Sequence, residues 1–164
     1  MFMSSLLSKS EVIRHREFHF IGMSAVTINQ AELKGEGVIP SLWSNFYENH
    51  VLERIPNKKN STMIALYTEY ESDETGPYTI ALGTEIIEGE AVPSGLEKWI
   101  VPESNYVVFT TRIGPVQEVV VETWQEIWEW SKHNERAFQF DFELYDIRSI
   151  DPMNGQVDIY ISVK

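Results

Sequence analysis

The sequence predicts an α+β fold in which two pseudo-symmetric strand–helix–strand–strand units form one curved antiparallel sheet with two main helices. The same order of strand and helix patterns occurs twice along the chain. The helix patterns share an aromatic spacing, which is Trp43-x-x-Phe46-Tyr47-Glu48 in the first unit and Trp124-x-x-Ile127-Trp128-Glu129 in the second. The strand after each helix carries the same pair, Leu66-Tyr67 and Leu144-Tyr145. Two such units can join their strands into one sheet and lay both helices against it.

The length and composition favour a single folded domain. The chain has 164 residues, of which 43% are hydrophobic, so it can bury a substantial core. We expect an N-terminal tail over residues 1–11 and one domain over 12–164, with halves at about 12–88 and 99–164. The start of the chain is a poor signal peptide, and no apolar run approaches membrane-spanning length. The absence of cysteine excludes disulfides and thiolate sites and fits a cytoplasmic location.

The charge balance restricts the partners. Acidic residues outnumber basic ones, 25 to 13, which gives a net charge of -12. This balance opposes binding to nucleic acid or to an anionic membrane, since both require clustered lysine and arginine. It is compatible with a cationic ligand, although an acidic excess is more often an ordinary solvated surface.

The first unit is predicted from four segments. Glu11–Ile28 has an extended pattern, and Gly22 within it marks a kink or a close approach of another backbone. Apolar residues at helical spacing predict an amphipathic helix over Pro40–Arg54. Thr62–Tyr70 and Tyr78–Ile87 are strands joined by an acidic turn, so they form an antiparallel hairpin.

The second unit repeats this order after a connection. Glu88–Lys98 contains glycine and proline and is predicted to link the halves. Asn105–Ile113 is a strand, and the helix that follows runs from Gly114-Pro115 to near His133. Two further strands are predicted at Ala137–Ile147 and Gln156–Lys164.

The strand predicted over Ala137–Ile147 contains the main candidate functional residues. Its alternation separates two faces, Phe138, Phe140, Phe142 and Leu144 on one and Gln139, Asp141, Glu143 and Tyr145 on the other. We expect the phenylalanine face to lie under a helix. The repeat aligns Glu143 with Ala65, so only the second half carries an acid there. Two interpretations remain open: Glu143 is screened from water and forms a cation site, or it faces solvent and is ordinary.

The ordered set of motifs resembles the GyrI-like effector-binding family over roughly residues 12–164. Within that family it is most similar to stand-alone members and integron-associated effector-binding proteins, and similar domains form the ligand-sensing part of multidrug-responsive transcription activators. The residues that carry the resemblance are Pro40, Leu42-Trp43-x-x-Phe46, Tyr67-Thr68-Glu69-Tyr70-Glu71-Ser72-Asp73, Trp124, Ile127-Trp128-x-Trp130, Asp141-Phe142-Glu143-x-Tyr145-Asp146 and Val157-Asp158-Ile159-Tyr160-Ile161. The sequence departs from many relatives at Ser162, where they have proline, and we expect this to affect edge pairing more than binding.

The resemblance implies a concave sheet with a ligand pocket near the pseudo-twofold axis. In relatives that bind lipophilic cations, this pocket has aromatic walls and an acidic residue. The resemblance places Glu143 at the acidic position, and makes Asp141 a rim or structural residue. The other expected ligand-binding residues are Trp43, Tyr67, Tyr70, Trp99, Trp128, Tyr145 and Asp158, whereas Phe46 and Trp124 are expected to pack in the core.

The sequence therefore predicts non-enzymatic binding of hydrophobic, cationic small molecules by a stand-alone sensor or effector-binding protein related to transcription regulators. No catalytic residue, metal or cofactor is expected. Neither direct binding to nucleic acid nor a membrane association is expected, since no helix-turn-helix flanks the domain and the charge is acidic. One alternative is a hydrolase of electrophilic small molecules that uses Glu143 beside Tyr145. Another is an interaction or inhibitor module that presents the acidic clusters 69–74 and 85–90 to a protein partner.

Overall fold

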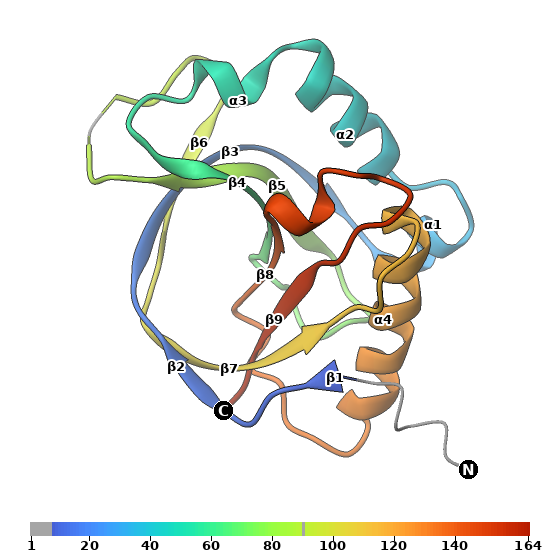
Figure 1. Cartoon of the computed structure of the whole chain (residues 1–164). Coiled ribbons are helices and arrows are strands. Elements are labelled where there is room, and N and C mark those ends of the chain that lie inside the picture. Colours follow the sequence, from blue (N-terminus) through green and yellow to red (C-terminus); the bar gives the residue numbers. More distant parts are fainter. Residues whose placement is uncertain (1–7, 90) are drawn as a thin grey trace.

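The computed structural model describes residues 8–89 and 91–164, which form one large, curved antiparallel sheet covered by helices on one face (Figure 1). Along this sheet the strand order is β1-β7-β9-β8-β4-β5-β3-β6, and β2 also pairs with β7. The strands are β1 (Ser8–Lys9), β2 (Ile13–His15), β3 (Phe18–Thr27), β4 (Lys58–Thr68), β5 (Tyr78–Ile86), β6 (Glu97–Val101), β7 (Ser104–Thr110), β8 (Phe140–Tyr145) and β9 (Asp158–Ser162). The helices are α1 (Asn29–Leu33), α2 (Ile39–Glu48), α3 (Val51–Arg54), α4 (Val116–Ser131) and the 3₁₀ turn η2 (Ile147–Ser149). None of the helices in this described part of the chain is long and apolar enough to span a membrane.

The internal repeat is confirmed by the order of the strands. The first unit is β3–α2–β4–β5 and the second is β7–α4–β8–β9, and their strands meet as β7-β9-β8 against β4-β5-β3. This order reads the same from both ends, so a pseudo-twofold axis passes between β8 and β4. Ala65 pairs directly with Glu143 across these two strands. The two residues that the repeat aligns therefore lie side by side at the axis.

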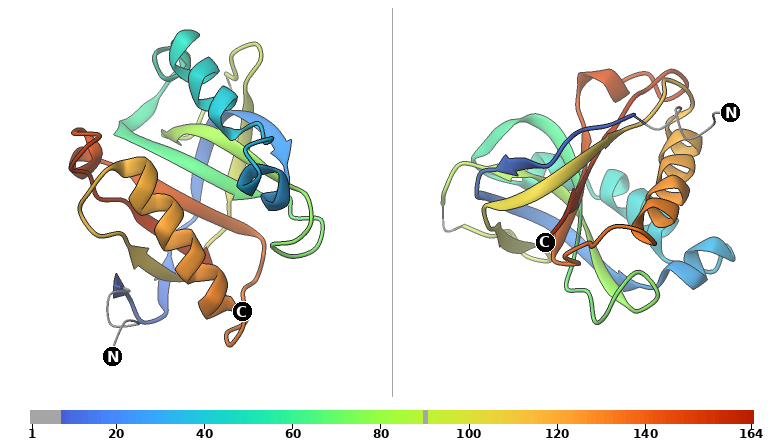
Figure 2. Two further views of the ribbon diagram at one scale, coloured as in Figure 1. Left: turned by 90° about the vertical axis from the view of Figure 1, so that its right-hand side faces the viewer. Right: turned by 90° about the horizontal axis from the view of Figure 1, so that it is seen from below.

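Both main helices lie on the Glu143 face of the sheet (Figure 2, left). Leu42 and Phe46 of α2 pack with Ala65 of β4, and Ile127 of α4 packs with Ile159 of β9. The expectation that the phenylalanine face of β8 lies under a helix is wrong. The central strands β4, β8 and β9 bury residues on both faces. The sequence of such a strand does not indicate which of its faces the helices cover.

The opposite, concave face has a core of its own. Phe142 stacks on Tyr160 of β9 with ring centroids 4.6 Å apart, and it meets Phe18 edge-on at 5.2 Å. The chain crosses from one side of the sheet to the other in this region, because β2 pairs with β7 whereas β3 pairs with β5 and β6. This crossing draws the two sides of the sheet together and encloses the concave core.

The close approach predicted at Gly22 is confirmed. Gly22 of β3 lies opposite Gly83 of β5, and a Cβ atom at Gly22 would lie 2.6 Å from the Leu82 carbonyl oxygen. Side chains at this crossing would force the two strands apart, so the glycines permit the tight curvature of the sheet.

Four elements differ from the sequence prediction. The helix predicted over 40–54 is divided into α2 and α3 because His50 adopts a left-handed backbone, with φ 49°. The connection predicted over 88–98 ends in a strand, β6, which pairs with β3. The strand predicted from residue 137 begins at Phe140, since Phe138 is left-handed with φ 52°. The predicted tail, 1–11, includes β1, which pairs with β7, and residues 1–7 of it lie outside the described residues.

Candidate functional site

Glu143 lies at the centre of the helix-covered face and is buried, with 1% of its surface exposed. Three neutral donors surround its carboxylate. Tyr67 of β4 donates its hydroxyl to Oε2 at 2.7 Å, and the indole Nε1 of Trp124 in α4 donates to the same oxygen at 2.6 Å. Tyr145 donates its hydroxyl to Oε1 at 2.5 Å. The strand pairing and α4 thus bring donors from three segments to one buried acid.

The charge of Glu143 is not balanced by a cation among the described residues, because its three partners are neutral. Burial raises the pKa of Glu143 above its ordinary value, and the bonds from Tyr145, Trp124 and Tyr67 oppose that rise in part. Burial, together with the neighbouring negative charge, raises the pKa values of Tyr67 and Tyr145 far above the ordinary value. Both tyrosines therefore remain protonated donors at neutral pH.

Aromatic rings from both helices approach this carboxylate. The ring of Trp43 in α2 meets Tyr145 edge-on with centroids 5.3 Å apart, and Trp124 meets Tyr67 at 5.2 Å. Trp128 lies one turn further along α4, 6.5 Å from Trp124. None of these five residues is fully buried, so each keeps part of its surface accessible to solvent.

Asp141, two residues before Glu143, belongs to a separate buried network. It forms an ion pair with Arg136 at 2.9 Å, and both side chains are almost fully buried. Tyr70 donates its hydroxyl at 2.5 Å to the same oxygen of Asp141, Oδ2, that Arg136 contacts. The backbone N–H and the hydroxyl of Ser162 donate to its other oxygen at 2.6 and 2.9 Å. Asp141 is thus compensated and has the surroundings of a structural residue.

Ser162 matters for this network rather than for edge pairing alone. A proline at this position would have no backbone N–H to donate to Asp141. Serine supplies that bond and a second one from its hydroxyl. The departure noted in the sequence thus concerns the interior of the protein.

The structure separates three of the predicted ligand-binding residues from Glu143. Tyr70 binds Asp141 instead. Trp99 of β6 packs in the concave core, and its indole donates to Glu69 at 3.1 Å. Asp158 lies on the same face of β9 as Tyr160, which is the concave face. It pairs there with Arg148 at 2.8 Å. Their positions in the sequence could not show this, because it depends on which face each strand turns toward the helices.

Of the predicted ligand-binding residues, Tyr67 and Tyr145 bind Glu143, Trp43 contacts Tyr145, and Trp128 lies further out beside Trp124. Trp124, which was expected to pack in the core, also binds Glu143. The repeat itself contained the missing signal, since Trp124 aligns with Trp43 and the two helices are related by the pseudo-twofold axis. Phe46 is 1% exposed and packs in the core, as expected.

The arrangement suits recognition of a positive charge. A buried carboxylate without a counter-charge has lost hydration that a bound cation can replace. The faces of tryptophan and tyrosine attract cations by about 0.5–2 kcal/mol each.

The amino-acid sequence is similar to a known protein family and to a bacterial relative. The model of a family described as integron-associated effector binding protein (Cass2) matches residues 11–163. The putative transcriptional regulator protein YobU of Bacillus subtilis (strain 168) is 40% identical over 146 residues, which cover 88% of this chain and 91% of YobU.

Solved structures show the same architecture. An integron cassette protein from the mobile metagenome of Vibrio cholerae is 27% identical, with a TM-score of 0.75 over 96% of this chain and 97% of that protein. The structure of SAV2435 bound to tetraphenylphosphonium also has a TM-score of 0.75, covering 94% of this chain and 93% of SAV2435 at 19% identity.

Proposed function

The chain belongs to the integron-associated effector-binding family, and we propose that it binds hydrophobic cations at Glu143 as a cytoplasmic, non-enzymatic effector-binding protein. The relative YobU is described as a putative transcriptional regulator, so we propose that the bound compound acts as a signal. A structural relative, SAV2435, was solved with the lipophilic cation tetraphenylphosphonium, which gives the proposal a concrete probe.

The observation that carries this proposal is the buried carboxylate with three neutral donors. A carboxylate kept for structural reasons is ordinarily paired with a cation, as Asp141 is with Arg136. Glu143 instead has hydroxyl and indole donors, which hold its position without neutralising its charge. The half-buried rings of Trp43, Trp124 and Tyr145 would surround the apolar part of the ligand.

The acidic clusters offer less support for a protein-interaction module. The Glu69 carboxylate accepts bonds from Thr79 and Trp99, and the Glu85 carboxylate is paired with Arg16. These two carboxylates are thus occupied within the protein. The hydrolase alternative is weaker as well, because both oxygens of Glu143 are already held by donors.

Titration with tetraphenylphosphonium tests the proposal. We expect saturable quenching or a shift of tryptophan emission, since Trp124 donates to the carboxylate and Trp43 lies beside it. Tetraphenylborate has the same shape and the opposite charge, so it should bind at least tenfold more weakly. Equal affinity for the two ions would contradict the proposed role of the carboxylate.

The affinity for the cation should fall in weakly acidic solution. Because burial raises the pKa of Glu143, protonation begins at a higher pH than for an exposed glutamate and removes the attracting charge. The stability of the unliganded protein responds to pH in the opposite direction. Protonation removes an uncompensated buried charge, so this residue adds stability at low pH and loses that contribution as pH rises through the raised pKa. Isothermal titration calorimetry across this range should also show proton release on binding.

That pH dependence must disappear when Glu143 is replaced by glutamine. A profile that the Glu143→Gln variant shares with the wild type would assign the titration to another group. The pH-dependent part of the hypothesis would then be wrong.

A further inference from the structure

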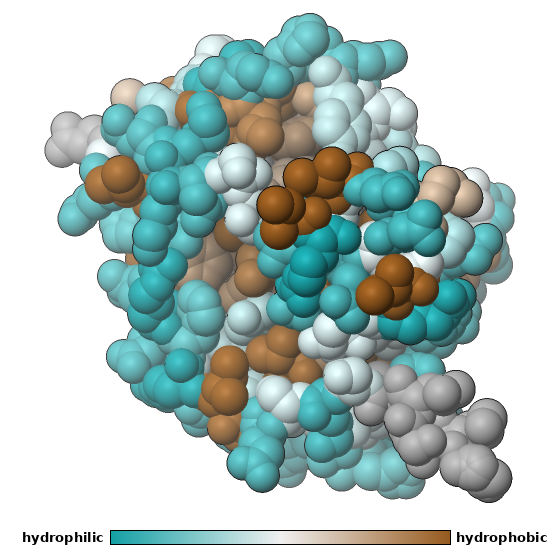
Figure 3. Space-filling model, viewed as in Figure 1, coloured by the Kyte–Doolittle hydropathy of each residue, from teal (hydrophilic) through white to brown (hydrophobic). Residues whose placement is uncertain are grey.

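The concave face of the sheet holds a cavity, on the side away from Glu143. Its volume is about 170 Å³. The apolar part of its lining comes from Phe18, Ile64, Phe142 and Leu144. Figure 3 shows a recess left of centre in which apolar residues lie deep within a hydrophilic frame.

The sheet itself separates this cavity from the first site. Phe142 and Leu144 flank Glu143 on β8, so their side chains leave the opposite face of the strand. Ile64 is related in the same way to Ala65, the cross-strand partner of Glu143. A molecule in the cavity would therefore contact neither Glu143 nor the rings around it.

Arg16 and Glu85 line the mouth of the cavity, and Lys59 lies beside them through its contact with Glu85. Arg16 binds the Glu85 carboxylate through both terminal nitrogens, at 2.6 and 2.9 Å. Lys59 approaches the same carboxylate at 3.5 Å, and 43% of its side chain is exposed. Two cations thus share one carboxylate, which leaves about one positive charge. His15 also lines the cavity.

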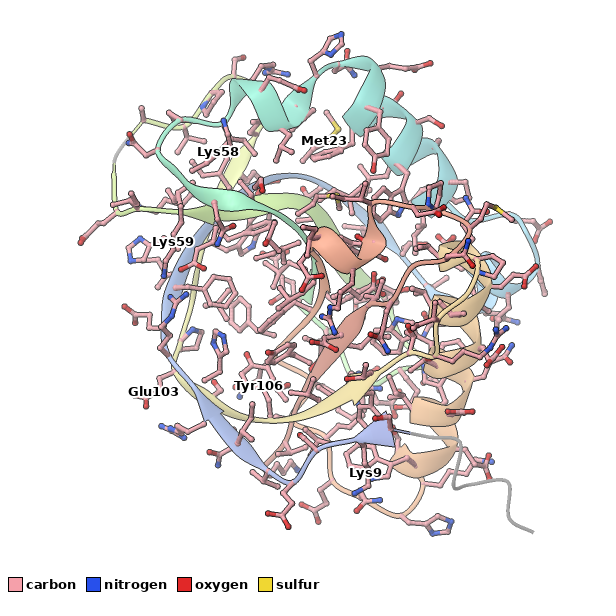
Figure 4. All side chains as sticks on the ribbon, in the orientation of Figure 1. Lys9, Met23, Lys58, Lys59, Glu103 and Tyr106 are labelled. Atoms are coloured by element: carbon pink, nitrogen blue, oxygen red, sulfur yellow. The ribbon has the colours of Figure 1, made fainter. Side chains whose placement is uncertain are left out.

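This local excess stands out in a chain whose net charge is -12. Figure 4 shows Lys59 on the concave side of β4, beside β3, whereas its neighbour Lys58 points to the other side. The Lys58 ammonium donates to the Ile55 carbonyl oxygen at 2.9 Å. The two lysines are adjacent in sequence, but their side chains lie on opposite sides of the sheet.

We propose that this cavity is a second binding site, for a compact aromatic monocarboxylate of the size of benzoate. A cavity of about 150 Å³ with aliphatic and aromatic walls is sufficient for one benzene ring. The ring would lie against Phe18 and Phe142, and the carboxylate would remain at the rim with Lys59 and Arg16. The charge preference is opposite to that of the Glu143 site.

The test uses three ligands with the same ring: benzoate, benzamide and benzylammonium. We expect benzoate to bind with a dissociation constant on the order of 1 mM, appropriate for so small a ligand. Methyl resonances of Ile64 and Leu144 should shift in ¹H–¹³C spectra. The indole N–H resonance of Trp124 should not move. Benzamide should bind more weakly than benzoate, and benzylammonium most weakly.

Two variants locate the ligand. Leu144→Phe should fill the cavity and weaken benzoate binding at least fivefold, because Leu144 lines it and is only half-buried. Lys59→Gln should weaken binding by about threefold at low salt, the effect expected for one partly exposed charge. Lys58→Gln is the matched control and should leave the affinity unchanged.

Several results would overturn the second site. The first is the absence of a methyl shift at about 20 mM benzoate, which is 20-fold the expected dissociation constant. The second is a shift of the Trp124 indole N–H resonance. The third is equal binding of all three ligands. Saturation with tetraphenylphosphonium should leave benzoate binding intact. Because the two ligands are followed separately, failure of the cation proposal would leave this result interpretable.

Discussion

Replacing Glu143 by glutamine is expected to weaken tetraphenylphosphonium binding by about 30-fold, or about 2 kcal/mol, which is within the range for a charge-assisted contact. The amide fits the site. Its oxygen can take the place of Oε2 and accept from Trp124 and Tyr67, while its NH₂ group donates to the hydroxyl oxygen of Tyr145. The fold should therefore persist, and removing an uncompensated buried charge should leave the melting temperature unchanged or raise it.

The control is Glu118→Gln, which removes the same charge from the exposed side of α4. It tests whether affinity depends on the overall charge of the protein or on one carboxylate. We expect the control to bind like the wild type in a fluorescence titration. If Glu143→Gln and wild type have equal affinities, Glu143 does not bind the cation.

Replacing Asp141 by alanine is expected to lower the free energy of unfolding by about 3–5 kcal/mol, the range for breaking a buried ion pair. The substitution leaves the guanidinium of Arg136, which is 4% exposed, without its carboxylate. It also removes the acceptor for Ser162 and Tyr70. Urea unfolding followed by tryptophan emission measures the loss from the shift in midpoint.

Asp146→Ala provides the matched comparison, since Asp146 pairs with Arg148 at 3.0 Å and about a third of each side chain is exposed. Its loss should cost no more than about 1 kcal/mol. Comparable destabilisation by the two variants would show that the Asp141 network is not a main source of stability.

The two carboxylates of β8 thus have different expected effects. Asp141 is fully compensated, so its removal should reduce stability. Glu143 is held by neutral donors, so its neutralisation should reduce affinity and spare stability. Their positions two residues apart place them on one strand face, and only their partners distinguish them.

Local patterns were sufficient for most of the fold. Helical spacing located α2 and α4, and alternation located β4, β5, β7, β8 and β9, because side-chain periodicity is a property of each segment alone. β6 was missed because Gly89, Pro93 and Gly95 dominate the preceding segment, and the strand exists through its pairing with β3. The break between α2 and α3 was missed because a left-handed residue, His50, leaves the apolar spacing intact.

The sequence by itself determined the α+β class, the two repeated units and the family, and it selected Glu143 as the candidate ligand-binding acid. These follow from periodicity and from the order of motifs, which are written along the chain. The tertiary structure decided which face of β8 the helices cover, and hence that Trp124 meets Glu143 whereas Trp99 and Asp158 do not. The physical reason is that both faces of β8 are buried, so hydrophobicity cannot tell them apart. Only the pairing of strands and the packing of the helices assign each face its partners.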